Sequence, residues 1–347
     1  MFTKNNRTKS NRVIVITLIA LSCVLVAGVG AEELRDSQYG KLEISGFVDA
    51  TASYSKTSAD HTNFGLGQAE IDLESQLNEI SSVNIAVAYN NETATFELGC
   101  AEIGLNLYSN DQSFFKSVDL VAGQFDVPFG IDYFCYPSVD RKLVSVPMVV
   151  ELTHGGWSDV GFSIQVGHEY GNLTVYGVNG FESSAEVIDE VATLSAGYNV
   201  YEEIDNTPAY SIGSRIGFNL INNLEVGTSY SMGMNVSDER EMYLAGADLK
   251  YTVSGFEFKG EYIYHSLNRS LAQENNEGYY AQASYNKDRW TVTSRYGSFK
   301  PYQLDWYNQV SVGAGYVIGE GIEARFESAM FDNSADNTQY LQMVVAF

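Results

Sequence analysis

The stretch that decides the fold is the final one, "QYLQMVVAF" at residues 339–347. Leu341, Met343, Val345 and Phe347 fall on alternate positions and give the segment one continuous apolar face. Alternation with a period of two indicates a β-strand. Because no residues follow that could fold over this face, we expect it to meet an apolar surrounding other than a protein core.

The first 31 residues predict export. Their charged side chains are all basic, an apolar run follows over 13–29, and small residues end it before Glu32. We therefore expect 1–31 to be a secretory signal peptide cleaved after Ala31. A lone membrane anchor and a lipoprotein signal at Cys23 are the alternatives that the segment leaves open.

The composition of the remaining chain narrows the class. Removing the four basic residues of 1–31 from the 20 Lys and Arg leaves 16 against 44 Asp and Glu, a net charge of −28. Such an acidic protein repels nucleic acid. No second apolar stretch approaches 18 residues, while 24 Tyr, 18 Phe and 31 Gly favour strands and turns over helices. We expect a short periplasmic segment at 32–40 and one folded unit at 41–347.

Alternation recurs along most of this unit. In "AEIDLESQL" at 69–77, for example, Glu70, Asp72 and Glu74 face away from the apolar residues. Sixteen such segments are predicted to be strands: 42–54, 64–77, 80–89, 97–108, 117–126, 157–168, 172–179, 209–220, 223–233, 241–251, 256–265, 277–286, 289–299, 308–318, 322–331 and 338–347. The stretch 180–208 is read as a long acidic loop, with a further strand or hairpin as the alternative.

The connections indicate how the strands are joined. Short turns alternate with longer, more polar connections along the chain, as in barrels of the outer membrane. All five prolines fall in or beside the long connections. The sequence therefore predicts an all-β protein, a transmembrane antiparallel barrel of about 16 strands, whose last strand turns its apolar face to lipid. A soluble sandwich or solenoid is the alternative, although no internal repeat supports a solenoid.

Three motifs add a resemblance. "VAGQFDVPFGIDYF" at 121–134, "DRKLVSVPMV" at 140–149 and "GGWSDVGFSIQVG" at 155–167 are similar to those of the phosphate-selective porin O/P family. The resemblance implies a trimeric, 16-stranded outer-membrane porin whose long third loop folds into the lumen. A terminal Phe347 also resembles the signal that the barrel-insertion machinery reads.

The charges of this chain depart from that family's anion selectivity. Parity places few basic but many acidic side chains on the lumen face, and these include Glu43, Asp49, Glu70, Asp72, Glu74, Arg215, Glu225, Lys259, Arg295, Glu323 and Arg325. An acidic wall favours cations and raises a barrier to anions. We therefore expect the pore fold, but not the phosphate specificity, to carry over.

Two further features concern the third loop. It contains Asp132, Asp140, Arg141, Lys142 and Glu151, which we interpret as a constriction with a transverse field; an ordinary external loop is the alternative. Cys100 in the fourth strand and Cys135 in the loop are the two cysteines outside the signal, and an oxidising periplasm would allow them to form a disulfide.

The function predicted from these features is passive diffusion of small hydrophilic solutes or ions, with a preference for cations. An anion-specific porin that uses Arg141 and Lys142 and a non-conducting receptor or adhesin are the alternatives. We find no catalytic motif, metal-ligand spacing or cofactor motif. The expected partners are outer-membrane lipid and lipopolysaccharide, the insertion machinery, two further copies in a homotrimer, and the transported solutes.

Overall fold

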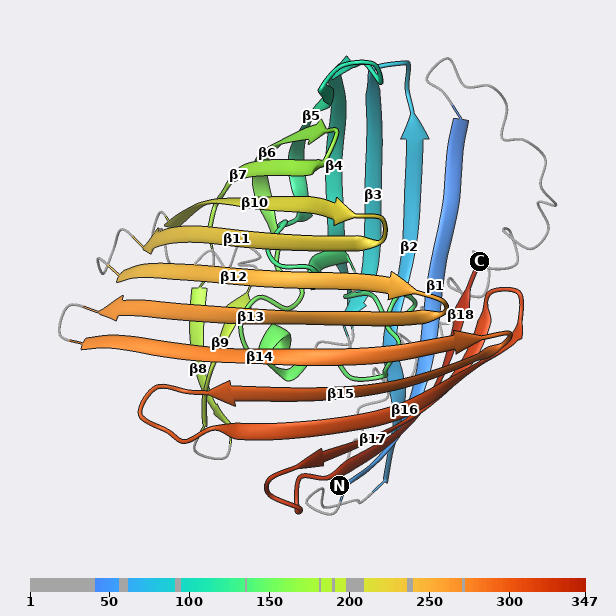
Figure 1. Ribbon diagram of the computed structural model, residues 1–347, viewed down its shortest axis with the longest axis vertical. Helices are drawn as coiled ribbons and strands as arrows, with labels where there is room; N and C mark the ends of the chain where they lie inside the picture. Colours follow the sequence, from blue (N-terminus) through green and yellow to red (C-terminus); the bar gives the residue numbers. More distant parts are fainter. Residues whose placement is uncertain are drawn as a thin grey trace, which may run out of the picture.

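The computed structural model describes residues 41–55, 62–90, 95–134, 136–180, 182–188, 191–197, 209–235, 240–269 and 272–347. Within these ranges, sixteen strands form one closed antiparallel barrel (Figure 1). Each strand pairs with its neighbours in the chain, and the last pairs with the first. The barrel predicted from the sequence is confirmed, strand for strand.

The barrel strands are β1 (Lys41–Ser55), β2 (Thr62–Gln76), β3 (Ser81–Asn90), β4 (Thr95–Ser109), β5 (Phe115–Asp126), β6 (Ser158–His168), β7 (Gly171–Val178), β10 (Ala209–Ile221), β11 (Leu224–Asn235), β12 (Arg240–Val253), β13 (Phe256–Arg269), β14 (Ala272–Lys287), β15 (Trp290–Lys300), β16 (Tyr307–Gly319), β17 (Ile322–Phe331) and β18 (Thr338–Ala346). Between β7 and β10, the strands β8 (Glu182–Ile188) and β9 (Val191–Gly197) form a separate hairpin. The hairpin alternative for 180–208 is thus the one that the structure shows, and 189–190 and 198–208 lie outside the described residues.

The terminal strand closes the barrel by pairing with the first strand. Gly46 in β1 and Phe347 exchange two backbone hydrogen bonds, of 3.1 Å and 3.0 Å, beyond the last paired residues of β18. The polar edge of the final strand is therefore satisfied by the first strand, as a closed barrel requires. Its apolar face, with Leu341 and Met343, points outward and is exposed.

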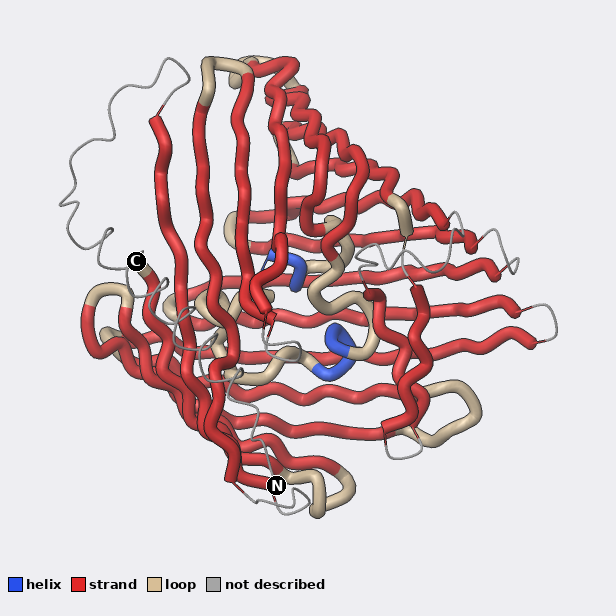
Figure 2. The backbone as a smooth tube through the Cα atoms, turned by 180° about the vertical axis from the view of Figure 1, so that it is seen from behind, coloured by secondary structure: helices blue, strands red, loops and turns tan. Residues whose placement is uncertain are grey.

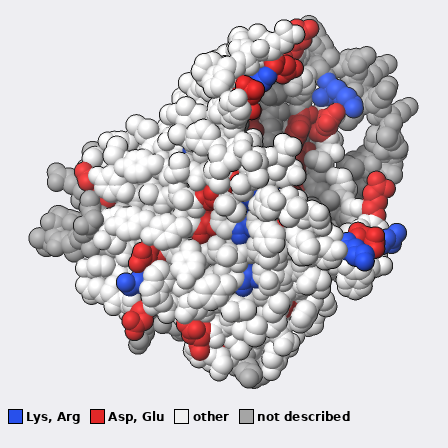
Figure 3. All heavy atoms as spheres, viewed as in Figure 1, with Lys and Arg blue, Asp and Glu red and all other residues white. Residues whose placement is uncertain are grey.

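The outer surface is apolar and the inner surface polar. In β16, for example, Val310 and Val312 are about two-fifths exposed, while Ser311 between them is fully buried. Figure 3 shows an outer face that is largely free of charged side chains. Because an outward apolar band is what lipid solvates, the alternation suits a membrane. Among the described residues, no helix is long and apolar enough to cross a bilayer.

The connection between β5 and β6, residues 127–157 and here called the constriction loop, lies inside the barrel (Figure 2). It contains the single-turn elements η1 (Asp132–Phe134) and α2 (Met148–Glu151). Its apolar side chains, among them Phe129, Val149 and Val150, pack into one buried cluster with inward-facing residues of the wall: Met242, Leu244, Ile263, Tyr280 and Phe299. The predicted folding of the third loop into the lumen is confirmed.

The outward position of Val312 yields a direct test. In lipid vesicles, we expect Val312→Arg to lower the free energy of unfolding by about 2–4 kcal/mol, the typical cost of Arg on the lipid face of a barrel near the bilayer centre. Urea titration would measure it, with Val312→Ala as the matched control. Equal unfolding free energies for the two variants would show that this face does not contact lipid.

Candidate functional site

Three arginines of the barrel wall hold the backbone of the constriction loop. Arg215 in β10 donates from Nε to the carbonyl oxygen of Gly130 at 2.7 Å. Arg295 in β15 donates to the carbonyl oxygens of Ser145 at 3.0 Å and Val146 at 3.1 Å. A loop within a barrel has no strand partner for its carbonyl groups, so side chains must satisfy them.

The third anchor is Arg325 in β17, which donates to the carbonyl oxygens of Ser138 and Val139. All three arginine side chains are 2% exposed. These residues, which the sequence assigned to the lumen face, are in contact with the loop.

Each anchor is neutralised by a carboxylate of the wall. Arg215 pairs with Asp248 at 2.7 Å and, more weakly, with Glu225 at 3.3 Å. Arg325 pairs with Glu323 at 2.6 Å. Charges removed from water are tolerated when they are paired and hydrogen-bonded in this way.

The Arg295 anchor includes a carboxylate that itself bonds to the loop. Its carboxylate partner, Glu327, lies 3.7 Å away and is fully buried. Glu327 also accepts hydrogen bonds from the backbone N–H of Ser145 at 2.8 Å and from its hydroxyl at 2.6 Å. Arg295 and Glu327 thus both bond to Ser145. Because they also pair with each other, loss of either would leave the other as an unpaired buried charge.

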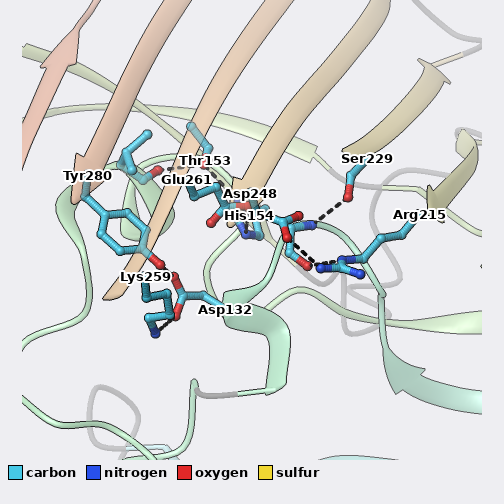
Figure 4. A network of polar contacts seen from close by, with 11 residues as sticks. Asp132, Thr153, His154, Arg215, Ser229, Asp248, Lys259, Glu261 and Tyr280 are labelled. Atoms are coloured by element: carbon cyan, nitrogen blue, oxygen red, sulfur yellow. Dashed lines mark hydrogen bonds and ion pairs between the residues drawn. The ribbon is translucent and has the colours of Figure 1, made fainter. Parts of the chain in front are cut away.

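A fourth attachment centres on Asp132, at the start of η1. Lys259 in β13 donates to its Oδ1 at 2.6 Å, and the Tyr280 hydroxyl in β14 donates to its Oδ2 (Figure 4). Nearby, the backbone N–H of Gly130 donates to the Ser229 hydroxyl at 2.9 Å. Gly130 has φ +67°, and a Cβ there would lie 1.8 Å from Oε1 of Glu261. Only glycine fits both the backbone conformation and this close approach.

His154 lies beside Glu261 behind the loop. Its Nε2 is 3.9 Å from Oε1 of Glu261, and both side chains are almost fully buried. Burial lowers the pKa of His154 to about 4, with the nearby Asp132 acting in the opposite direction. The imidazole is therefore neutral at physiological pH.

The remaining charges of the constriction loop lie elsewhere. Arg141 donates to Oε1 of Gln68 at 3.4 Å, an atom that also accepts from the backbone N–H of Ser138 at 2.6 Å. Gln68 occupies a β-bulge of β2, where the register with β1 shifts beside Asp49. Asp140 and Lys142 flank Arg141 on the same segment, and Glu151 ends α2.

A cavity of about 300 Å³ lies between the constriction loop and the wall made by β1–β4. Its loop side is made by Asp132, Tyr133, Tyr136 and His154, among others. Its wall side carries Glu70, Asp72 and Cys100, and Asp126 at the end of β5 completes it. None of the described residues that line this cavity is Lys or Arg.

The carboxylates of the cavity differ in how they are compensated. Asp132 is paired with Lys259. By contrast, Glu70, Asp72 and Asp126 have no hydrogen bond or ion pair within the described ranges, and each faces other carboxylates. The cavity therefore holds carboxyl groups that no basic side chain of its described lining compensates.

The structure places the other predicted residues as follows. Glu43 pairs with Lys41 at the exposed start of β1, Asp49 is buried and accepts from the backbone N–H of Gln68, and Glu74 is an exposed residue of β2. Cys135 lies outside the described residues, so its disulfide with Cys100 stays a prediction. In the part of the chain that the structure describes, no group of His, Cys, Asp or Glu side chains is arranged to hold a metal ion.

Sequence reasoning missed Gln68, Tyr133, Tyr136 and His154. Parity assigns Gln68 no special role, because the bulge that aims it at the loop has no clear sequence signal. The tyrosines and the histidine lie in an irregular loop to which strand parity does not apply. Their positions became known only from the structure of the loop inside the barrel.

Comparison with known proteins identifies the fold. No family model and no curated protein matches the chain. Among solved structures, the anion-selective porin of Comamonas acidovorans is similar with a TM-score of 0.64 and 11% identity, over 89% of this chain and 100% of that one. The outer membrane channel DcaP of Acinetobacter baumannii is similar with a TM-score of 0.62 and 11% identity, over 89% of this chain and 98% of that one. The trimer form of OmpT from Vibrio cholerae is similar with a TM-score of 0.60 and 9% identity, over 89% of this chain and 100% of that one. The chain thus has the fold of outer-membrane porins.

Substitution of one anchor tests its contribution to stability. We expect Arg295→Met to lower the free energy of unfolding by about 3–5 kcal/mol, because Glu327 is left buried without its partner. The double variant Arg295→Met/Glu327→Gln should recover part of that loss, since the orphaned charge is removed.

Urea unfolding in detergent micelles would measure both variants, with Arg289→Met in an exposed turn as the control. A cost for Arg295→Met no larger than that for Arg289→Met would contradict the anchoring role.

Proposed function

We propose that the protein is a passive diffusion channel in the outer membrane of a Gram-negative bacterium and that it prefers cations. The observation that carries the proposal is the cavity between the constriction loop and β1–β4. It lies where a lumen partly filled by the loop remains open, and carboxylates without basic partners line it. Small hydrophilic solutes are the expected cargo, and no catalytic step is proposed.

The preference follows from which charges reach the cavity. Arg215, Arg295 and Arg325 are buried against the loop, and Lys259 is paired with Asp132. The carboxylates of Glu70, Asp72 and Asp126 face the open space instead. Rings or clusters of carboxylates favour cations in a narrow pore, where charges are screened less than in bulk water.

The comparisons support the channel but not its selectivity. One similar structure is described as an anion-selective porin, and its identity with this chain is only 11%. At this level the likeness carries the fold alone, so the charges of this chain must decide the selectivity. The motifs at 121–167 favour descent from the phosphate-selective porin O/P family, which we retain as a proposal separate from ion preference.

The anion-specific alternative depends on Arg141 and Lys142. Neither residue lines the cavity, and Arg141 is bonded to Gln68. A phosphate in this cavity would face Glu70 and Asp72, and no Lys or Arg of the described residues lines it. The geometry therefore favours the cation channel.

Assembly and location in the membrane complete the proposal. A homotrimer is supported by the fold, since the similar OmpT structure is described as a trimer form. The exposed apolar surface would contact outer-membrane lipid and lipopolysaccharide. Phe347 would serve as the insertion signal, and 1–31 as the signal peptide.

Planar-bilayer recording under a KCl gradient tests this function. We expect steady channels whose reversal potential shows K⁺ preference over Cl⁻. The variant Glu70→Gln/Asp72→Asn/Asp126→Asn should reduce the K⁺/Cl⁻ permeability ratio by about threefold or more, because it removes the fixed charge at the narrow site.

Glu320→Gln, in the short turn between β16 and β17, is the matched control and should leave the ratio unchanged. Chloride preference in the unmodified protein would contradict the proposed selectivity. Absence of any conductance would overturn the channel itself and favour a receptor or adhesin.

A further inference from the structure

The charges buried behind the constriction loop do not balance. Arg215 pairs with Asp248, and Lys259 pairs with Asp132. Glu261 is the third carboxylate of this group, and neither of its oxygens has a hydrogen-bond partner. Figure 4 shows it among these residues, on the side of His154. An ionised carboxylate that is fully buried and unbonded is strongly unfavourable.

The hydrogen bonds of His154 define its tautomer. The Thr153 hydroxyl donates its one hydrogen to the carbonyl oxygen of Val149 at 2.6 Å. Its oxygen therefore accepts from Nδ1 of His154, 3.1 Å away, so Nδ1 carries a hydrogen. In a neutral imidazole, Nε2 is then an acceptor, and it too has no hydrogen-bond partner.

Two acceptors thus face each other across 3.9 Å, Nε2 of His154 and Oε1 of Glu261. The side chains are 2% and 0% exposed, and a Cβ at Gly130 would lie 1.8 Å from Oε1 of Glu261 and 3.0 Å from Nε2 of His154, so the site has no room for a larger residue there. We propose that His154 and Glu261 share one proton, and that this proton is a latch that keeps the constriction loop against the barrel wall. It neutralises the third carboxylate and supplies the hydrogen that both acceptors lack.

The latch joins the loop to the wall because its halves belong to different elements. His154 is in the loop and Glu261 is in β13. Charged and titratable groups face the pair from each neighbouring element: Asp132 from η1, Arg215 from β10, Asp248 from β12, Lys259 from β13 and Tyr280 from β14. Burial lowers the pKa of His154 to about 4, so at neutral pH the proton resides on the carboxyl group of Glu261, whose Oε1 faces Nε2 at 3.9 Å.

The direction of the pH dependence follows. With the loop docked, the pair holds a proton that Glu261 would release once the loop left and water entered. The docked state therefore binds one proton more than the released state, and rising pH favours release. The latch is present at neutral pH and is lost as the pH rises through the pKa of the pair.

Infrared spectroscopy of the folded protein tests the proton itself. The difference spectrum between the unmodified protein and Glu261→Gln should show the carbonyl stretch of one protonated carboxylic acid at neutral pH. That band should disappear on alkaline titration. The control is Glu257→Gln, the same substitution in the same strand at a residue ion-paired with Lys250, which should leave the band in place. A spectrum without the band would overturn the proposal.

Conductance tests the consequence and rests on the proposed channel function. As the pH is raised above neutral, single-channel conductance of the unmodified protein and of Glu257→Gln should increase as the loop is released. Glu261→Gln, whose amide donates to Nε2 at every pH, should keep the neutral-pH value. An equal increase in all three proteins would refute the latch.

His154→Asn provides a second variant if Glu261→Gln does not fold. It removes the acceptor, so the alkaline step should shift or vanish, and an unchanged step would count against the pair. If no variant conducts, the channel function fails while the infrared measurement still decides the proton.

Discussion

The backbone of the constriction loop must be hydrogen-bonded although it lies within a barrel and has no strand beside it. Arg215, Arg295 and Arg325 supply donors to its carbonyl oxygens at three separate points. Each arginine can be buried because a wall carboxylate neutralises it. Behind this frame the apolar side chains of the loop form a packed core with β12–β15. The position of the loop, and hence the shape of the lumen, depends on these bonds.

The attachment of the loop through buried arginines has an electrostatic consequence. The basic side chains of the wall are used on the side where the loop is attached, so few remain to attract anions. The open side, towards β1–β4, keeps Glu70 and Asp72 without partners. Among the described residues, the cavity on that side is lined by carboxyl groups and by no Lys or Arg. The same frame seals His154 and Glu261 from water, which is why a single proton can matter there.

The sequence predicted the barrel well because period-two alternation is a local property. All sixteen segments coincide with barrel strands. The sequence did not predict which side chains of the loop and the wall would contact one another. Ser145 and Glu327 are separated by 182 residues, and the bulge that presents Gln68 has no local signal. The hairpin β8–β9 lies in a stretch that the sequence predicted to be an acidic loop, with a strand or hairpin only as the alternative.

The central claim is that an acidic passage runs between the anchored loop and β1–β4, and Cys100 lines it. In a Cys135→Ser background, the rates at which positively and negatively charged thiol reagents of equal size modify Cys100 measure the potential there. The ratio does not depend on the reactivity of the thiol, which both reagents share. Modification by the cationic reagent faster by about tenfold or more is predicted. Equal rates, or faster modification by the anionic reagent, would contradict the account.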